Sequence, residues 1–192
     1  MDLHGKKIIL ASNSPRRREL LAGLDIDFTV DTDTSFIETY SPDTPHEMVP
    51  VLMSEGKSQF FHRPLADDEI LVTSDTMVLC GDEIMGKPAG REDAERMLRL
   101  LSGREHQVIT AVTLRDSSRM ETVTDTANVW FKELSAEEIS YYIENYKPFD
   151  KAGAYGIQEW IGYIGITRIE GSYFNIMGLP VHALYSLLLK FI

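Results

Sequence analysis

The sequence predicts an α/β fold, more closely an α+β arrangement in which one mixed sheet carries helices on its faces. Apolar runs of strand length alternate with segments whose apolar residues recur at helical spacing. Two β-rich runs also follow each other across a short polar loop, which is typical of a hairpin. The chain has 192 residues, 43% of them hydrophobic, and this length suits one domain that spans residues 1–192.

The first part of the chain is predicted to form a strand, a helix and a second strand. Residues 7–11 (KIILA) form a short, mostly apolar run. The segment 12–15 (SNSP) is typical of a helix start because it offers capping hydroxyls and a first-turn proline. We expect Gly23 to end that helix and the alternating residues 25–31 to form the next strand. Helical spacing over residues 46–61 predicts a second helix.

A longer strand follows at residues 69–80, where the polar run 73–76 (TSDT) interrupts an apolar pattern and requires an explanation. Residues 91–101 have one apolar face and predict a third helix, which Gly103 follows. The remaining elements expected, in chain order, are strands at 106–115 and 120–132, a helix from the capping box 135–138 to about Tyr146, a strand at 161–169 and a last helix at 180–191.

Composition excludes several classes of protein. The net charge of −11 repels polyanions, so we expect no nucleic-acid binding, and no stretch is long and apolar enough to span a membrane. The single cysteine, Cys80, cannot form an intrachain disulfide, and the apolar run after the first residues is too short for a signal peptide. We therefore expect a cytoplasmic protein. A small anionic ligand is compatible with the net charge if several basic side chains converge on one pocket.

Three consecutive arginines stand in the first turn of the first predicted helix, where the helix dipole disfavours cations. A bound anion would explain them, because Ser12 and Ser14 precede the helix and can cradle a phosphate together with backbone N–H groups. Helical geometry favours Arg16 and Arg17 over Arg18 for this contact. The alternative is three solvated arginines whose stems cover apolar surface.

Other candidate site residues are charged and lie in segments where a charge is unusual. Asp75 lies inside a strand pattern, where a carboxylate is costly to bury unless it is paired or binds a metal; the alternative is a strand-end aspartate that caps a turn. Residues 81–87 resemble a P-loop, but Pro88 replaces the magnesium-binding hydroxyl, so we reject a P-loop and retain Lys87 as a point charge for a phosphate. No zinc-ligand spacing occurs among the histidines.

Two further basic residues and one amide stand in suggestive segments. Lys57 lies on the second predicted helix and Lys151 in the glycine-containing segment DKAGAYGIQ, where Gln158 could recognise a base edge through its donor and acceptor. Surface lysines and a tight structural loop are the alternatives.

Together these segments resemble one family over nearly the whole chain. The carriers of the resemblance are LASNSPRRRELL, SDTMV, GKP, ML with LSG, DKAGAYGIQ, and IEGSYFN with GLP. In this order they resemble the Maf family of nucleoside triphosphate pyrophosphatases. The resemblance implies an elongated fold similar to inosine triphosphate pyrophosphatases, with two lobes around a central cleft, and often a homodimer. It also implies hydrolysis of a nucleoside triphosphate to the monophosphate and pyrophosphate with a divalent cation.

The resemblance also implies roles for individual residues. Residues 12–17 are expected to bind the triphosphate, with Asp75 as the catalytic acidic residue and Lys57 and Lys87 as phosphate contacts. Glu38, placed by its distance before Pro42, is expected to join Asp75 in holding Mg²⁺ or Mn²⁺. The subgroup that prefers dTTP and UTP is marked by the arginine, threonine and glutamine found here as Arg16, Thr76 and Gln158, and we also expect Lys151 to bind substrate.

We therefore expect a hydrolase that acts on dTTP and UTP, with modified pyrimidine nucleotides as further candidate substrates. The resemblance also implies a role in removing damaged or non-standard nucleotides from the nucleotide pool. One alternative is a non-catalytic nucleotide-binding regulator of cell division, and another is a phosphatase that releases orthophosphate. Two small departures from the family pattern are Ser74, where alanine is usual, and Gly56, which weakens the second helix.

Overall fold

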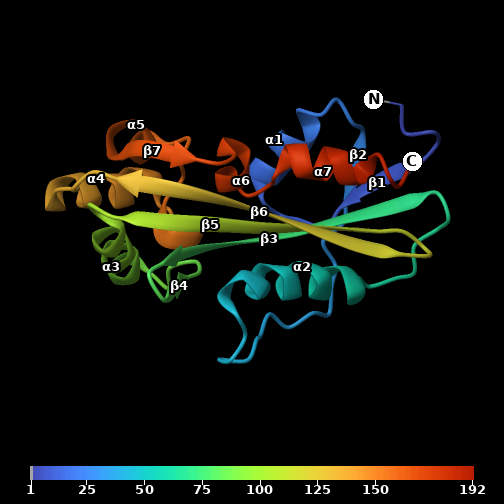
Figure 1. Cartoon of the computed structure of the whole chain (residues 1–192), viewed down its shortest axis with the longest axis horizontal. Coiled ribbons are helices and arrows are strands. Elements are labelled where there is room, and N and C mark those ends of the chain that lie inside the picture. Colours follow the sequence, from blue (N-terminus) through green and yellow to red (C-terminus); the bar gives the residue numbers. More distant parts are fainter. Residues whose placement is uncertain (1) are drawn as a thin grey trace. The chain divides into compact units, whose positions relative to one another are not determined.

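The computed structural model of the chain describes residues 2–192 (Figure 1). The described residues form a mixed α/β fold, which confirms the predicted class. The strands are β1 (Lys7–Leu10), β2 (Phe28–Val30), β3 (Glu69–Cys80), β4 (Glu83–Met85), β5 (Glu105–Arg115), β6 (Met120–Phe131) and β7 (Ile166–Glu170). The α-helices are α1 (Pro15–Ala22), α2 (Val49–Gln59), α3 (Arg91–Leu101), α4 (Ala136–Tyr146), α5 (Trp160–Gly165), α6 (Tyr173–Met177) and α7 (Val181–Leu188), with 3₁₀ turns η1 (His46–Met48) and η2 (Ala152–Ala154).

The described chain divides into two compact units. The first unit comprises residues 1–76, 110–125 and 178–192, and the second comprises residues 77–109 and 126–177. The prediction of a single domain over 1–192 stays a prediction. None of the helices formed by residues 2–192 is long and apolar enough to cross a membrane.

The first unit contains the strand order β2-β1-β3-β5-β6. β1 pairs in parallel with both β2 and β3, and the register places Leu10 beside Val72. Helices α1 and α7 lie on one side of these strands and α2 lies on the other (Figure 1). Buried side chains of β1, α1 and β3 form its core, among them Leu10, Leu21 and Ile70. The unit thus presents the middle of β3 to helices on both sides.

The second unit contains β4, the remaining parts of β3, β5 and β6, and β7, with β4 and β7 pairing antiparallel with β3 and β6. Its helix α3 buries the predicted face, formed by Ala94, Met97, Leu98 and Leu101. Helix α4 begins with the predicted capping box, in which Ser135 and Glu138 each accept a bond from the other's backbone N–H.

Several predicted elements differ from the observed ones. The strand expected at 161–169 is wrong, because residues 160–165 form helix α5 and only 166–170 form a strand. Gly165 approaches the ring of Phe131 so closely that a Cβ would lie 2.9 Å from it, and the fully buried Ile161 lies one turn earlier on the same face. This packing stabilises a helical turn where the apolar pattern alone also suits a strand. Strand β4 and helix α6 were not predicted.

Candidate active site

The polar interruption of β3 is explained by helices on both sides of the strand. Side chains alternate along a strand, so Thr73 and Asp75 point to one side and Ser74 and Thr76 to the other. Thr73 and Asp75 contact residues of α2, whereas Ser74 and Thr76 contact the carbonyl of Gly178. Each polar side chain of the run therefore has a partner, which allows four such residues inside a largely buried strand.

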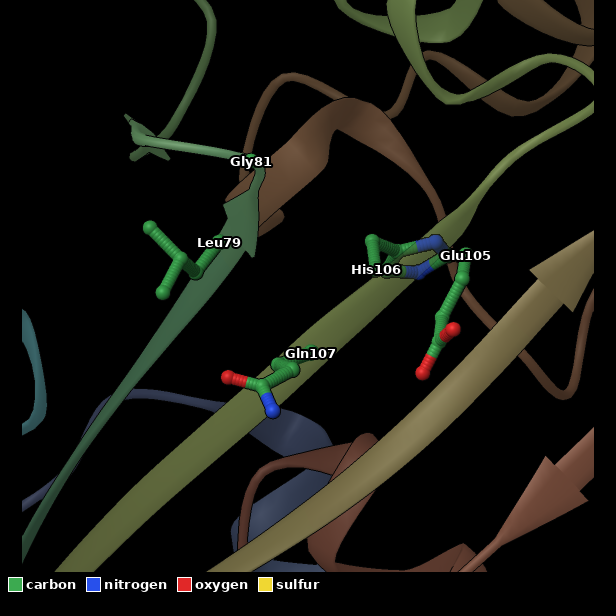
Figure 2. Close-up of a pocket in the computed structure, with 5 residues that line it drawn as sticks. All are labelled: Leu79, Gly81, Glu105, His106 and Gln107. Carbon is green, nitrogen blue, oxygen red and sulfur yellow. The ribbon is translucent and has the colours of Figure 1, made fainter.

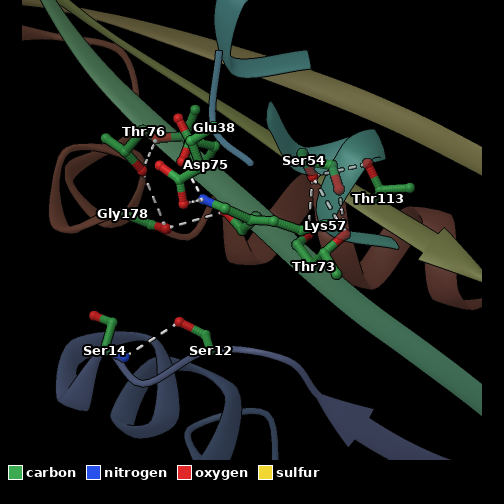
Figure 3. Close-up of polar contacts among 12 residues, drawn as sticks. Ser12, Ser14, Glu38, Ser54, Lys57, Thr73, Asp75, Thr76, Thr113 and Gly178 are labelled. Atoms are coloured by element: carbon green, nitrogen blue, oxygen red, sulfur yellow. Dashed lines mark hydrogen bonds and ion pairs between the residues drawn. The ribbon is translucent and has the colours of Figure 1, made fainter. Parts of the chain in front are cut away.

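A lysine joins the two acidic residues that the sequence singled out. Lys57 Nζ donates to Asp75 Oδ1 at 2.6 Å and lies 3.1 Å from Glu38 Oε1 (Figure 3). The side chains of Lys57 and Asp75 are 18% and 19% exposed, and that of Glu38 is 60% exposed. The predicted Glu38, Lys57 and Asp75 thus come together although they belong to a loop, a helix and a strand.

The loop that carries Glu38 is fastened to α2 by a close approach. The ring of Phe36 packs on Gly56, where a Cβ would lie 2.2 Å from ring atoms. The same loop is bonded to the end of α2, since Ser35 N and Thr34 Oγ1 both donate to Phe60 O. Gly56, which weakens the helix by its propensity, therefore gives room for the contact that holds this loop near Lys57.

Arg17 donates three hydrogen bonds within the protein, two of them to the residues on either side of Asp75. Its Nη1 donates to Ser74 O at 2.8 Å, its Nη2 to Thr76 Oγ1 at 3.0 Å, and its Nε to Gly178 O at 2.8 Å. Burial lowers the pKa of the Arg17 guanidinium, and the negative charge of Asp75 opposes that effect. The two residues next to Asp75 are consequently fixed by an arginine from α1.

The serine loop before α1 has the geometry of a capped helix start. Ser14 is the N-cap, and its Oγ accepts a bond from Arg17 N at 3.4 Å, while Ser12 Oγ accepts one from Ser14 N at 3.2 Å (Figure 3). Each serine oxygen acts as an acceptor in these bonds, and each hydroxyl has in addition one proton that it can donate. Arg16 lies half-buried in the first turn of the same helix.

The second unit holds the other three predicted residues. Lys151 is buried, and its Nζ contacts Asp150 Oδ1 at 2.7 Å and Glu159 Oε1 at 3.1 Å. Lys87 is exposed, and its segment meets that of Lys151 because Gly153 N donates to Gly86 O.

The loop with Gln158 is ordered by a buried tyrosine. Tyr142 OH donates to Glu159 Oε2 and accepts a bond from Gly156 N at 2.9 Å. Burial raises the pKa of the Tyr142 phenol, and its bond to Glu159 adds to the effect. Gln158 Oε1 is a buried acceptor without a partner among the described residues. An unpaired acceptor of this kind is costly unless a donor is supplied from outside the chain.

A hollow of about 230 Å³ lies elsewhere in the second unit and contains none of the predicted site residues. It is lined by Leu79, Gly81, Glu105, His106 and Gln107 (Figure 2). His106 is buried beside Tyr155, whose OH lies 2.7 Å from its Nε2, and burial lowers the pKa of His106 to about 3. The imidazole is therefore neutral at physiological pH and acts in packing.

Acidic side chains are the groups of this site that could hold a metal ion. Among residues 2–192, no group of three or more His, Cys, Asp or Glu side chains is placed to hold a metal ion. Asp75 and Glu38 nevertheless share one cation, the ammonium of Lys57. Mg²⁺ is commonly held by one or two carboxylates together with substrate phosphates and water. The chemistry of these two carboxylates therefore suits Mg²⁺ or Mn²⁺.

Comparison with known proteins decides the family. Residues 7–191 match the family described as Maf-like protein. This chain belongs to the Maf family. A relative from Parabacteroides distasonis, named dTTP/UTP pyrophosphatase, is 50% identical over 186 residues and covers 96% of each chain. Relatives of the same name from Phocaeicola vulgatus and Porphyromonas gingivalis W83 are 49% and 48% identical, covering 98% of both chains in the first case and 96% and 94% in the second.

A solved structure of a HAM1 protein from Coxiella burnetii matches this Maf family member with a TM-score of 0.40, at 14% identity. It covers 66% of this chain and 73% of that chain.

Several residues around the site were not singled out by the sequence. Gly178 supplies the carbonyl that Arg17 binds, and Tyr142 and Glu159 hold the segment of Lys151. Gly178 has a φ of +109°, which favours glycine. The only signal in the sequence for it was its place in the GLP segment.

Proposed function

We propose that the protein is a nucleoside triphosphate pyrophosphatase that hydrolyses dTTP and UTP to the monophosphate and pyrophosphate. The observation that carries the proposal is the contact of Lys57 with both Asp75 and Glu38, in a unit that also holds a capped serine-rich helix start. Converging acidic and basic groups are what a site for a metal–triphosphate complex requires. The names of the relatives from Parabacteroides and Porphyromonas support the same substrates.

Asp75 and Glu38 would hold a divalent cation, Mg²⁺ or Mn²⁺, which when bound neutralises phosphate charge and polarises the α-phosphoryl group. The Asp75 carboxylate orients the attacking water and accepts its proton as the new oxygen–phosphorus bond forms at the α-phosphorus. The bond from the α-phosphorus to the bridging oxygen breaks, and pyrophosphate leaves with that oxygen. Lys57 directs the Asp75 carboxylate through their 2.6 Å contact.

The triphosphate is bound by residues at the start of α1. Ser12 and Ser14 donate their hydroxyl protons to phosphate oxygens, while the dipole of α1 and the charge of Arg16 attract them. Arg17 adds its charge to this binding group, and Lys87 serves the leaving pyrophosphate as a point charge.

Base selection is assigned to Arg16, Thr76 and Gln158, with Lys151 as a further substrate contact. The unpaired Oε1 of Gln158 can accept the N3–H that uracil and thymine carry and cytosine lacks at that position. A site that leaves a buried polar group unpaired with the wrong base discriminates strongly. We also propose a cytoplasmic location and a homodimer, which gel filtration with light scattering would test.

The proposal is tested by assaying pyrophosphate and orthophosphate separately from a panel of nucleoside triphosphates with Mg²⁺ or Mn²⁺. Pyrophosphate is expected from dTTP and UTP, with loss of turnover in Asp75→Asn and on removal of the metal by EDTA. The substitution keeps the shape of the side chain, so thermal unfolding of Asp75→Asn should show an intact fold. Nucleotide-dependent stabilisation without product would instead indicate the non-catalytic regulator, and orthophosphate as the product would indicate a phosphatase.

A further inference from the structure

A chain of hydroxyl groups fills the interface between α2 and the strands of the first unit (Figure 3). Ser54 Oγ lies 2.8 Å from Thr113 Oγ1 and 3.2 Å from Thr73 O, and Thr73 Oγ1 donates to Ser54 O at 2.8 Å. Ser54 and Thr73 are fully buried, with 0% of their surface exposed. The contacts continue from Thr113 Oγ1 to Thr122 Oγ1 at 3.0 Å and from Thr122 to Glu55 Oε1 at 2.8 Å.

The number of protons available decides which hydroxyl group is the donor in each hydrogen bond of this series. Each hydroxyl has one proton, and a carboxylate only accepts. Thr122 gives its proton to Glu55, so the bond from Thr113 to Thr122 uses the Thr113 proton, and Thr113 can only accept from Ser54. The single Ser54 proton is shared between Thr113 Oγ1 at 2.8 Å and Thr73 O at 3.2 Å, so this hydroxyl contacts both β5 and β3. Glu55 therefore terminates a one-way series that fixes the orientation of the Ser54 hydroxyl.

Ser54 and Thr73 lie shortly before the proposed catalytic residues in the sequences of α2 and β3. Ser54 precedes Lys57 by three residues on α2, which places them on the same face of the helix. Thr73 precedes Asp75 by two residues on β3, so both point to α2. The contacts Ser54–Thr73 and Lys57–Asp75 are thus neighbouring links between the same two elements, in the same chain direction.

We propose that Ser54 and Thr73 are positioning residues for the proposed reaction, because their hydroxyl contacts fix the register of α2 on β3 at which Lys57 reaches Asp75. The inference rests on the proposed function. Apolar side chains would fill this interface equally well, but they would tolerate sliding of the helix, whereas hydrogen bonds require one relative position of helix and strand. Lysine is long and flexible, so its contact alone would not select that register.

The experiment compares Ser54→Ala and Thr73→Val with two matched variants. Thr73→Ser keeps the hydroxyl, and Ser58→Ala removes another buried hydroxyl of α2, one that accepts a bond from Arg115 Nε of β5 at 3.2 Å. We expect Ser54→Ala and Thr73→Val to lower kcat for pyrophosphate release from UTP about tenfold, because small displacements of catalytic groups are costly. Thr73→Ser should restore most of it, and Ser58→Ala should keep kcat while lowering the melting temperature.

Two readouts separate positioning from general loss of stability. In a Lys57→Met background, Ser54→Ala should cause no further loss of kcat, since a positioning residue acts through the group that it positions. Independently of turnover, limited acetylation read by mass spectrometry should modify Lys57 several-fold faster in Ser54→Ala, with the exposed Lys190 as internal reference.

Every result bears on one of the two proposals. An inactive wild-type protein overturns the proposed function, and the acetylation of Lys57 still tests the register. An active wild type with additive losses in the Lys57→Met background, or with unchanged acetylation of Lys57, overturns the positioning role. If Ser54→Ala does not fold, Ser54→Cys replaces it, because the thiol keeps the size of the side chain and donates more weakly.

Discussion

Replacing Arg17 by lysine keeps the positive charge and removes the planar fork. In the structure the guanidinium satisfies the carbonyls of Ser74 and Gly178 and the hydroxyl of Thr76 from three nitrogens. One ammonium can replace about one of these bonds, so two are lost, each worth about 1.5 kcal/mol or more because the donor is charged. The expected loss in the free energy of unfolding is therefore about 3 kcal/mol, and for a protein of this size the melting temperature should fall by about 6–12 °C.

Differential scanning calorimetry and urea unfolding would measure this loss. Arg18→Lys is the matched control, because Arg18 is the next residue, is exposed, and makes a single long contact of 3.4 Å to Asn13. Its effect should lie within about 0.5 kcal/mol. A fall in melting temperature of less than about 2 °C together with a loss of pyrophosphate release would contradict this reasoning. Arg17 would then serve the substrate, and its three hydrogen bonds within the protein would not stabilise the fold.

Further predictions concern the loop contact at Gly56, the buried histidine and the buried tyrosine. Gly56→Ala raises helix propensity by about 1 kcal/mol but displaces the ring of Phe36, so activity should fall while α2 gains stability, as kinetics and hydrogen exchange would show. Burial lowers the pKa of His106 to about 3, so the stability linked to its neutral form is complete above pH 6.5 and is lost as pH falls toward 3. Unfolding titrations of His106→Phe should lack that part of the acid dependence, which is worth at most about 5 kcal/mol. Tyr142→Phe leaves the N–H of Gly156 without its acceptor and should lower stability by about 2 kcal/mol in urea unfolding, whereas an unchanged midpoint would show that another acceptor replaces the phenol.

The sequence by itself determined the elements whose pattern is local. Strand 69–80 and helix 91–101 were predicted with their observed bounds, because residues close in sequence set the apolar period and the end signals. The capping box at Ser135 was equally readable, since both of its bonds join residues three apart. The candidate residues Asp75 and Lys57 were also identified from local chemistry and the resemblance, although their mutual contact was not.

Only the tertiary structure decided which distant groups meet. Arg17 and Gly178 are 161 residues apart, and nothing in either segment specifies their bond. The helix at 160–165 depends on the ring of Phe131, and the glycine at position 56 is explained by the approach of Phe36. Such pairs form only when the complete fold brings the two segments together. Closing the long loops between them costs conformational entropy, which the whole set of contacts in the fold offsets. The types of residue at the site could therefore be predicted from the sequence. Packing decided which of them face a substrate and which bond to other parts of the protein.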